Sequence, residues 1–393
     1  MIDRIKKKNA GLPLVFALLA ATGGIAHADG WTIGDEQSNL HIGGALRARY
    51  DYDFSSTPTT SKVSLDTAIL NLTYKSPTVI GNLQWRCYEY YGHVCDANFP
   101  VDAWVGYKFG DKHQVQVGLN PISFGLGQYW GNTFYLGLGN VLGLEDAHDL
   151  GVKYSYANGP VDAQVAFYPR DGGNYTGQSR DSKRFTVNLV NADPYVPNGT
   201  QTSERNMLIG RVAYKFKHSD TASTEVGVSG WTSEVHNNAN GENGSRKALA
   251  IHTKNSWNNW NLQLLAANQK IDTKNPGNGN LVSMGGFDGS FNVAAKGNVY
   301  VADLSYNVDG KFGDVSSIKP YLNYSTFRKS ESGFNPSTRI IPGVSFNYQK
   351  LSIYAEMHYG KHDQYVGEAN GLGAGTGPDG WVRRFYLNAA YYF

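Results

Sequence analysis

The last residues of the chain, Trp381 to Phe393, alternate between two kinds of side chain and stop on a phenylalanine. Counting back by twos from Phe393 gives an apolar face with aromatic ends, and the opposite face carries Arg384, Asn388 and tyrosines. In a β-strand these two sets point to opposite sides of the sheet. A closed membrane barrel needs a final strand of this kind, although a soluble β-sandwich can also end on an apolar strand. The ending favours a barrel and makes Phe393 its expected assembly signal.

The same period of two recurs from end to end, most clearly at 41–54, 101–109, 150–156, 161–168 and 351–360. An amphipathic helix would instead repeat every 3.6 residues. Short turns follow one strand of each pair, and longer loops rich in Gly, Asn and Ser follow the other, the clearest being 121–148, 169–204, 272–295 and 361–380. We therefore predict an all-β fold, a transmembrane antiparallel barrel of about 16 strands with short periplasmic turns and long outer loops.

The expected strands have boundaries uncertain by several residues. They are 40–54, 63–75, 81–91, 100–109, 113–120, 149–156, 161–168, 205–216, 223–235, 246–254, 258–270, 296–307, 317–327, 338–348, 350–360 and 381–393. A further strand-like run, 184–190, is assigned to an excursion within the fourth outer loop. A seventeenth strand would break the even count that places both termini at the periplasmic end.

The N-terminus has the pattern of a secretory signal. Arg4 and three lysines precede a short apolar run at 11–21, and Ala26-His27-Ala28 supplies small residues for cleavage before Asp29. The apolar run is too short to cross a bilayer. We expect residues 1–28 to be a signal peptide and residues 29–393 to form one barrel domain.

Composition agrees with a barrel and excludes other classes. Hydrophobic residues make up 41% of the chain and the mean hydropathy is −0.41, which does not fit a helical membrane protein. In a barrel every second strand residue is expected to face water inside, so apolar residues are diluted. The predicted signal carries four of the 35 basic residues and one of the 33 acidic residues. The remainder is nearly neutral, so no nucleic-acid partner is expected.

Cys87 and Cys95 lie eight residues apart in a chain predicted to be exported. An oxidising compartment favours a disulfide between them, and two unpaired thiols remain the alternative. Metal-ligand spacings and the common catalytic motifs are missing from the sequence, so neither a cofactor nor enzymatic activity is expected. A barrel enzyme with Ser/His or paired carboxylates near its outer rim remains an alternative.

The third outer loop, 121–148, is unusually apolar and rich in glycine for a loop in water. We predict that it folds into the barrel and narrows it, the alternative being that it packs on the rim or on a neighbouring subunit. Its expected constriction residues are Gln128, Tyr129, Trp130, Asn132, Tyr135, Glu145 and Asp146.

Strand parity also predicts a set of basic residues lining the pore: Arg47, Arg49, Arg86, Lys108, Lys153, Arg211, Lys215, Lys319 and Arg384. The same parity places carboxylates on the lumen side, at Asp51, Asp102, Asp162, Glu225, Asp303 and Glu356. Opposed charges across a wet channel act as a charge filter, and most such charges individually are only solvated wall. We expect Glu145 and Asp146 to face a basic strip formed by Arg47, Arg49, Arg86 and Lys108, giving weak net selectivity.

Two stretches resemble a known family. The sequence D-A-W-V-G-Y-K-F-G-D-K-H-Q-V-Q-V-G-L-N-P-I-S-F-G-L at 102–126, and G-L-E-D-A-H-D-L-G-V-K-Y-S-Y at 143–156, are similar to Gram-negative outer-membrane porins of the phosphate-selective O and P group. The resemblance implies a trimer with one channel per subunit. Anion-selective members of that group use an arginine ladder and a basic third loop, whereas this chain has no Lys or Arg between Leu119 and Leu150.

The resulting expectation is a water-filled porin for passive diffusion of small hydrophilic solutes and ions in the outer membrane. A channel preferring a sugar, phosphate or small organic acid is the first alternative, with Tyr129, Trp130 and Tyr135 as a stacking track. A barrel enzyme or adhesin is the second. The expected partners are outer-membrane lipid and lipopolysaccharide, the barrel-assembly machinery and two further copies of the chain.

Overall fold

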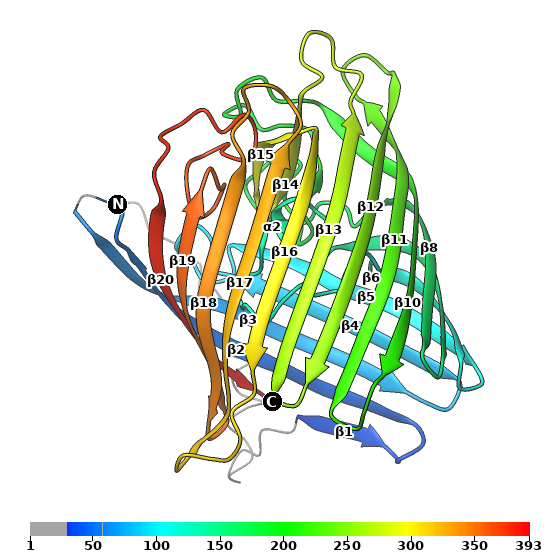
Figure 1. Cartoon of the computed structure of the whole chain (residues 1–393). Coiled ribbons are helices and arrows are strands. Elements are labelled where there is room, and N and C mark those ends of the chain that lie inside the picture. The colour runs from blue at the N-terminus through cyan, green and yellow to red at the C-terminus, as the bar shows by residue number, and fades with distance from the viewer. Residues whose placement is uncertain (1–29, 57) are drawn as a thin grey trace, which may run out of the picture.

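The computed structural model describes residues 30–393 except residue 57, and within them an antiparallel sheet closes into a barrel (Figure 1). The predicted signal peptide and its cleavage point lie outside the described residues. Closure joins the first long strand to the last, with Ala45 opposite Tyr392 and Asp53 opposite Arg384. The final residue completes this seam, because Phe393 and Gly44 exchange both backbone hydrogen bonds, at 2.7 and 3.0 Å.

The predicted fold class is confirmed, and each of the sixteen predicted strands overlaps one barrel strand of the described chain. These are β2 (Asn39–Asp53), β3 (Thr60–Lys75), β4 (Val79–Tyr88), β5 (Ala97–Phe109), β6 (His113–Pro121), β7 (His148–Asn158), β8 (Val161–Asp171), β10 (Thr202–Lys217), β11 (Ala222–Asn237), β12 (Asn243–Trp257), β13 (Trp260–Asp272), β16 (Lys296–Tyr306), β17 (Val315–Lys329), β18 (Ser337–Tyr348), β19 (Leu351–Lys361) and β20 (Val382–Tyr392). The agreement follows from the period of two, which a half-buried strand imposes on its side chains.

An apolar belt covers the outside of the barrel. Along β12, for example, Leu249 and Ile251 are about 60% exposed, whereas the intervening Ala250 is buried. Aromatic pairs lie on the strands near the short-turn end, as between Tyr107 and Phe109 at 4.8 Å. A barrel wall in a bilayer needs an apolar belt that is bordered by aromatic side chains at the membrane surface. Across the described residues, no helix has the length and apolar character needed to span a membrane.

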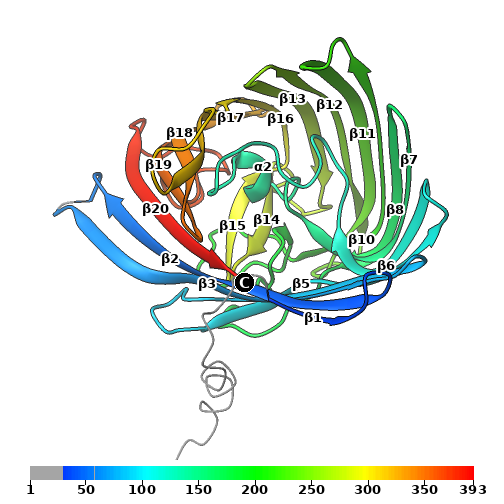
Figure 2. The same cartoon turned by 90° about the horizontal axis from the view of Figure 1, so that it is seen from below.

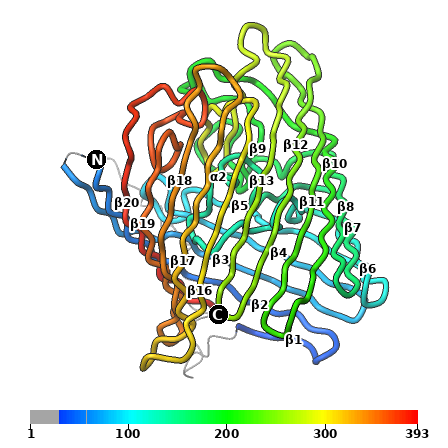
Figure 3. Tube along the Cα trace, in the orientation of Figure 1, coloured from blue at the N-terminus to red at the C-terminus, as the bar shows by residue number. Residues whose placement is uncertain are grey.

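The two ends of the barrel differ in their connections, as the trace in Figure 3 lets the reader follow. Tight turns such as 76–78 and 258–259 join strands at one end, which we call the periplasmic end by the rule for outer-membrane barrels. Four long connections leave the other end, at 122–147, 172–201, 273–295 and 362–381. The remaining connections at that outer end are short, such as 238–242, so only half of the outer loops are long.

Several short elements lie outside the predicted strands. β1 (Trp31–Gly34) pairs with the start of β2, and α2 (Leu138–Val141) is a single turn in the third loop. A hairpin of β14 (Leu281–Gly286) and β15 (Gly289–Ala294) forms a small separate sheet with β9 (Asn188–Leu189). β9 falls within the run 184–190, which therefore pairs with another loop rather than with the barrel wall.

One side of the lumen is filled rather than wet, because α2, β14 and β15 lie inside the barrel (Figure 2). A continuous apolar cluster joins the third loop to inward-facing residues of β10 to β13, among them Trp231 and Leu265, each less than 5% exposed. The expectation that every second strand residue faces water inside is therefore wrong for this half of the wall. The open part of the barrel lies on the other half, toward β2 to β4 and β17 to β20.

A disulfide joins Cys87, near the end of β4, to Cys95 in the second outer loop, with their Cα atoms 4.7 Å apart. The carboxylate of Asp96 also accepts hydrogen bonds from the backbone N–H groups of Tyr90, Tyr91 and His93. The loop therefore has two independent restraints at the mouth of the barrel.

Candidate functional site: a channel bounded by the third loop

The third loop enters the lumen, and acidic side chains hold its backbone. The N–H of Trp130 donates to Glu145 at 2.7 Å, that of Asn132 to Asp303 at 3.0 Å, and that of Phe134 to Glu356 at 2.6 Å. The three acceptors lie in the loop itself, on β16 and on β19, so the segment is held along its length. A hydrogen bond to an ionised acceptor is roughly twice as strong as a neutral one, so the loop is held most firmly where the acceptor is charged.

Two buried arginines hold the loop on either side of α2. Arg339 on β18 donates to the carbonyl of Leu136 at 3.0 Å, and Arg246 on β12 donates to the carbonyls of Leu142 and Gly143 at 3.0 and 3.2 Å. The carbonyls of Leu142 and Gly143 follow the end of the helix and have no donor within it, so Arg246 of the wall supplies one. α2 is thereby fixed to two wall strands, β12 and β18, that are four places apart in the barrel.

Each of these arginines is also paired with a buried carboxylate. Arg246 contacts Glu204 at 2.9 Å, and Arg339 contacts Asp363 of the eighth outer loop at 2.6 Å. Removing one partner of such a buried pair typically costs about 3–5 kcal/mol, because the other charge is left uncompensated. The third loop is therefore attached to two side chains whose ion pairs are costly to disrupt.

The beginning of the loop is anchored by two further cations. Lys153 donates from Nζ to the carbonyl of Pro121 at 2.7 Å, and Arg211 donates from Nε to the carbonyl of Gly125 at 3.0 Å. Arg211 is also paired with Asp162 and Glu225, at 2.6 and 2.7 Å. Both residues were predicted to line the pore, and the structure instead places them beneath the loop as its supports.

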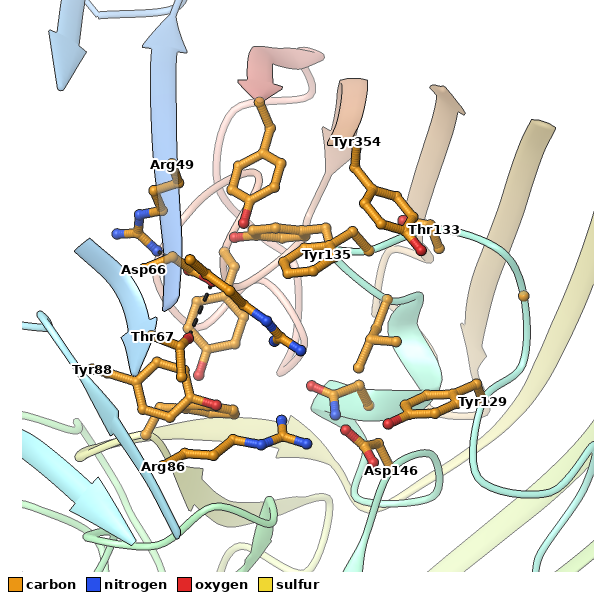
Figure 4. Close-up of a pocket in the computed structure, with 18 of the residues that line it drawn as sticks. Arg49, Asp66, Thr67, Arg86, Tyr88, Tyr129, Thr133, Tyr135, Asp146 and Tyr354 are labelled. Atoms are coloured by element: carbon orange, nitrogen blue, oxygen red, sulfur yellow. Dashed lines mark hydrogen bonds and ion pairs between the residues drawn. The ribbon is translucent and has the colours of Figure 1, made fainter. Parts of the chain in front are cut away.

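The space left open is a cavity of about 630 Å³ on the β2-to-β4 and β18-to-β20 side. Figure 4 shows Arg86, Tyr129 and Asp146 pointing toward the same part of it, with Tyr135 and Tyr354 on another side. A second cavity of about 420 Å³ lies nearer the periplasmic turns and includes Asn307 and Val308 in its lining. The two cavities share Lys319, Ser345 and Tyr354, so they adjoin along β17 to β19.

Of the nine predicted pore-lining cations, four line the larger cavity: Arg47, Arg49, Arg86 and Lys319. Lys108 and Lys215 lie outside both cavities, beside the periplasmic turns, where their backbone N–H groups bond Thr78 and Pro160. Arg384 pairs with Asp53 at 3.0 Å and donates to the carbonyl of Tyr365, so it supports the eighth outer loop. Strand parity alone does not distinguish a charged side chain that anchors a loop from a free charge on the wall.

Some of the predicted constriction residues line the larger cavity and others support them from outside it. Tyr129, Asn132, Tyr135 and Asp146 line the larger cavity. Gln128 supports them from behind, donating to the Tyr129 hydroxyl at 3.1 Å and to Asp146 at 2.9 Å.

Trp130 and Glu145 do not face the channel, which corrects their assignment to the constriction. Trp130 is 1% exposed and packs against Phe124, whose ring centroid is 6.3 Å from its own. Glu145 is 2% exposed behind the loop, and its burial raises the pKa of its carboxyl to about 8. The stacking track expected from Tyr129, Trp130 and Tyr135 therefore lacks its middle member.

Asp146 keeps a negative charge at the cavity. Burial acts to raise the pKa of its carboxyl, but contacts with His148 at 3.1 Å and Gln128 hold that pKa below its usual range. The pKa values of these two neighbouring acids are thus shifted in opposite directions. Glu145 is buried in an apolar layer, whereas Asp146 is surrounded by hydrogen-bond donors.

The lining of the larger cavity carries an excess of positive charge. It includes five cationic residues, Arg47, Arg49, Arg86, Lys319 and Arg339, against three acids, Asp66, Glu89 and Asp146. Arg49 contacts Asp51 at 3.0 Å and Arg339 contacts Asp363. Among the described residues, no carboxylate lies within ion-pair distance of Arg47, Arg86 or Lys319.

Aromatic side chains that were not among the predicted site residues surround these cations. The guanidinium of Arg47 lies over the rings of Phe134 and Tyr392, at 5.2 and 5.5 Å, and that of Arg86 lies over Phe185 at 4.8 Å. Arg339 and Arg246 were also missed as anchors, although both lie on the lumen parity of their predicted strands. Parity could have found Arg246, for example, since it lies on the same side of its strand as the buried Ala250.

The chain was also compared with known proteins. No protein-family model matches it, and no curated protein sequence matches it. Solved structures do. The outer membrane channel DcaP of Acinetobacter baumannii is similar with a TM-score of 0.61, at 12% identity, over 93% of this chain and 99% of that one. The chain has the fold of bacterial outer-membrane channels.

Two further structures give the same picture. OmpF of Salmonella typhi, solved with daunomycin, has a TM-score of 0.58 at 13% identity, covering 92% of this chain and 100% of that one. The anion-selective porin of Comamonas acidovorans has a TM-score of 0.55 at 14% identity, covering 91% and 100%. At such identities these likenesses establish the barrel architecture and leave cargo to the residues of this chain.

Proposed function

We propose that this barrel is an outer-membrane porin through which small hydrophilic solutes diffuse passively. The observation that carries the proposal is the pair of adjoining cavities that share Lys319, Ser345 and Tyr354. The larger is bounded by outer-loop residues such as Glu89 and Tyr365, and the smaller reaches Asn307 beside a periplasmic turn. Together they follow the lumen from the outer mouth toward the periplasmic end.

We further propose that the channel prefers anions, which is more specific than the weak selectivity expected from the sequence. The lumen acids Asp303 and Glu356 accept hydrogen bonds from the backbone of the third loop and are buried. Arg47, Arg86 and Lys319 remain exposed to the cavity without such partners among the described residues. At about 0.15 M salt the screening length is about 8 Å, so charges lining a narrow lumen still act on a passing ion.

A channel with a preference for small organic acids is the second candidate, within the same anionic class. The rings beside Arg47 and Arg86 would contact the carbon skeleton while the guanidinium groups bind a carboxylate. We also propose that the chain is related to the phosphate-selective O and P group and assembles as a trimer. In the same way, we propose that residues 1–28 are a signal peptide and that the assembly machinery recognises Phe393.

Planar-bilayer recording tests both statements. We expect steady channels and, in a KCl gradient, a reversal potential of the sign given by chloride preference. The double substitution Arg47→Gln and Arg86→Gln should move that potential toward zero. A matched control, Lys112→Gln with Lys311→Gln, removes the same charge from the periplasmic turns and should leave the potential unchanged. A protein with no channel activity would refute the porin proposal, and cation preference in the unmodified protein would refute the selectivity.

A further inference from the structure

The outer wall carries a row of lysines on adjacent strands. Lys247 on β12 lies directly opposite Lys270 on β13, and Lys270 lies directly opposite Lys296 on β16. All three are exposed, on the outward parity shared by Leu249 and Leu264. The strands lie side by side in Figure 1, and the row is near their outer-loop ends. We call Lys247, Lys270 and Lys296 the basic row.

This arrangement is unfavourable for the isolated protein. Residues directly opposite one another on antiparallel strands have Cβ atoms about 4.5–5.5 Å apart, and like charges at that spacing destabilise the sheet. The central member, Lys270, has a like charge on both sides. Natural sheets more often place opposite charges or neutral polar groups at such pairs, so an unbalanced row calls for a counter-charge.

Within ion-pair distance, the described residues supply no counter-charge to the row, and Asp272 acts on Lys270 only from farther away. Glu234 and Asp272 are the nearest acids along the same face, two residues closer to the loops. Glu234 is paired with Arg205 at 3.0 Å, and Asp272 is paired with Lys274 at 3.0 Å. No ion pair with a described carboxylate is made by any lysine of the basic row.

The surroundings of the row indicate what kind of counter-charge fits. On the membrane side lies the apolar belt, with Leu249, Ile251 and Leu264 exposed. Arg328 on β17 lies one level lower than the row, opposite Asn298, and its guanidinium covers the ring of Tyr300 at 5.6 Å. Basic groups next to an interfacial aromatic mark the level where lipid chains end and headgroups begin. An occupant therefore has an apolar part below and anionic groups at the level of the lysines.

We propose that the basic row binds the phosphorylated headgroup of an outer-leaflet lipid, which in this membrane is lipopolysaccharide. Three adjacent strands span about 10 Å, room for more than one phosphate. Lysine ammonium groups are mobile point charges suited to phosphate oxygens in a hydrated layer. The lipid's acyl chains would lie on the belt formed by Leu249, Ile251 and Leu264. Binding would convert the mutual repulsion of the lysines into attraction for a shared ligand.

The test is a lipid titration of the purified, detergent-solubilised protein followed by native mass spectrometry. The probes are purified lipopolysaccharide and the same lipid after enzymatic removal of its phosphates. We expect the unmodified protein to bind the phosphorylated form at least tenfold more tightly, with affinity that falls as salt is raised. The triple substitution Lys247→Gln, Lys270→Gln and Lys296→Gln should lose that preference. Equal binding of both lipids by the unmodified protein would overturn the proposal.

Matched variants separate this site from a general charge effect. Lys112→Gln, Lys217→Gln and Lys311→Gln together remove three exposed lysines at the periplasmic end and should bind the lipid as the unmodified protein does. Replacing the basic row by three arginines should retain binding. Loss of binding in the periplasmic triple variant to the same extent would show that net charge, not the row, is responsible, and would also overturn the proposal.

The other possible occupant of this face is a second copy of the chain. If the triple substitution dissociates an oligomer while lipid binding is unchanged, the face is a subunit interface and the lipid assignment is wrong. Because the row lies outside the lumen, single-channel conductance and reversal potential should be the same in every variant. The outcome is therefore independent of whether the proposed anion channel is correct.

Discussion

Arg339 and Asp363 form a two-pronged ion pair in which Nε and Nη2 donate to the two carboxylate oxygens at 2.6 and 2.7 Å. The same guanidinium reaches the third loop through the carbonyl of Leu136. Three parts of the chain that are far apart in sequence, β18, the eighth outer loop and the third loop, therefore meet at one buried side chain. This junction determines where the third loop stands in the lumen.

Replacing Arg339 by leucine should release the third loop from one side. Asp363 would be left buried without its partner, at a cost of about 3–5 kcal/mol in unfolding free energy. We expect a lower thermal midpoint and larger, noisier single-channel conductance, because the loop would no longer be fixed beside the cavity. Replacement by lysine keeps the charge but loses the paired hydrogen bonds of the guanidinium group. We therefore expect a thermal midpoint and a conductance between those of the unmodified protein and the leucine variant. Unchanged conductance in the leucine variant would show that Arg339 does not set the aperture.

Glu145 should make stability depend on pH. Its folded-state pKa is raised to about 8 by burial, so the folded protein retains a proton that the unfolded chain releases near its ordinary value of 4.5. Stability should then fall as pH rises from about 4.5 to 8 and level off above that. Glu145→Gln should remove this contribution, worth on the order of 1–4 kcal/mol. Denaturant unfolding at pH 5 and pH 8.5 measures it, and an identical pH slope in both proteins would contradict the assignment.

Asp146, unlike Glu145, should affect ion selectivity. Asp146→Asn removes a negative charge from the cavity that also contains Arg86 and should shift the reversal potential toward anions. The shift should shrink at about 1 M salt, where the screening length is about 3 Å. Glu145→Gln serves as the control, since that side chain lies behind the loop. A larger shift from Glu145→Gln than from Asp146→Asn would reverse the positions we assign to the two acids.

Deleting Phe393 should impair assembly of the barrel. Its backbone closes the seam by exchanging two hydrogen bonds with Gly44. Without the last residue, the terminal strand loses this pair and its outward aromatic end, so less protein should show heat-modifiable gel mobility in the outer membrane. Phe393→Tyr keeps both features and should assemble normally. Normal amounts of folded barrel after the deletion would contradict a role for the terminal residue.

How far the sequence could predict this structure depends on the range of the interactions. Alternation within a strand is local, so all sixteen strands could be predicted from the sequence. Parity does not report whether the inner side is wet, and the apolar inward residues Trp231 and Leu265 were the available signal of a filled lumen. The contacts of Asn132 with Asp303 and of Leu136 with Arg339 join residues more than 150 apart, which no local pattern encodes.

The carboxylates beneath the third loop connect the width of this channel to its charge. The backbone N–H groups of Asn132 and Phe134 cover Asp303 and Glu356 from the lumen side. The wall bonds the same acids through Asn323, and through Tyr321 and His358, respectively. Any event that lifts the loop both enlarges the lumen and uncovers two negative charges within it. The position of the third loop therefore determines both the size limit and the ion preference of this barrel. A variant selected for a wider pore will admit cations as well as larger solutes.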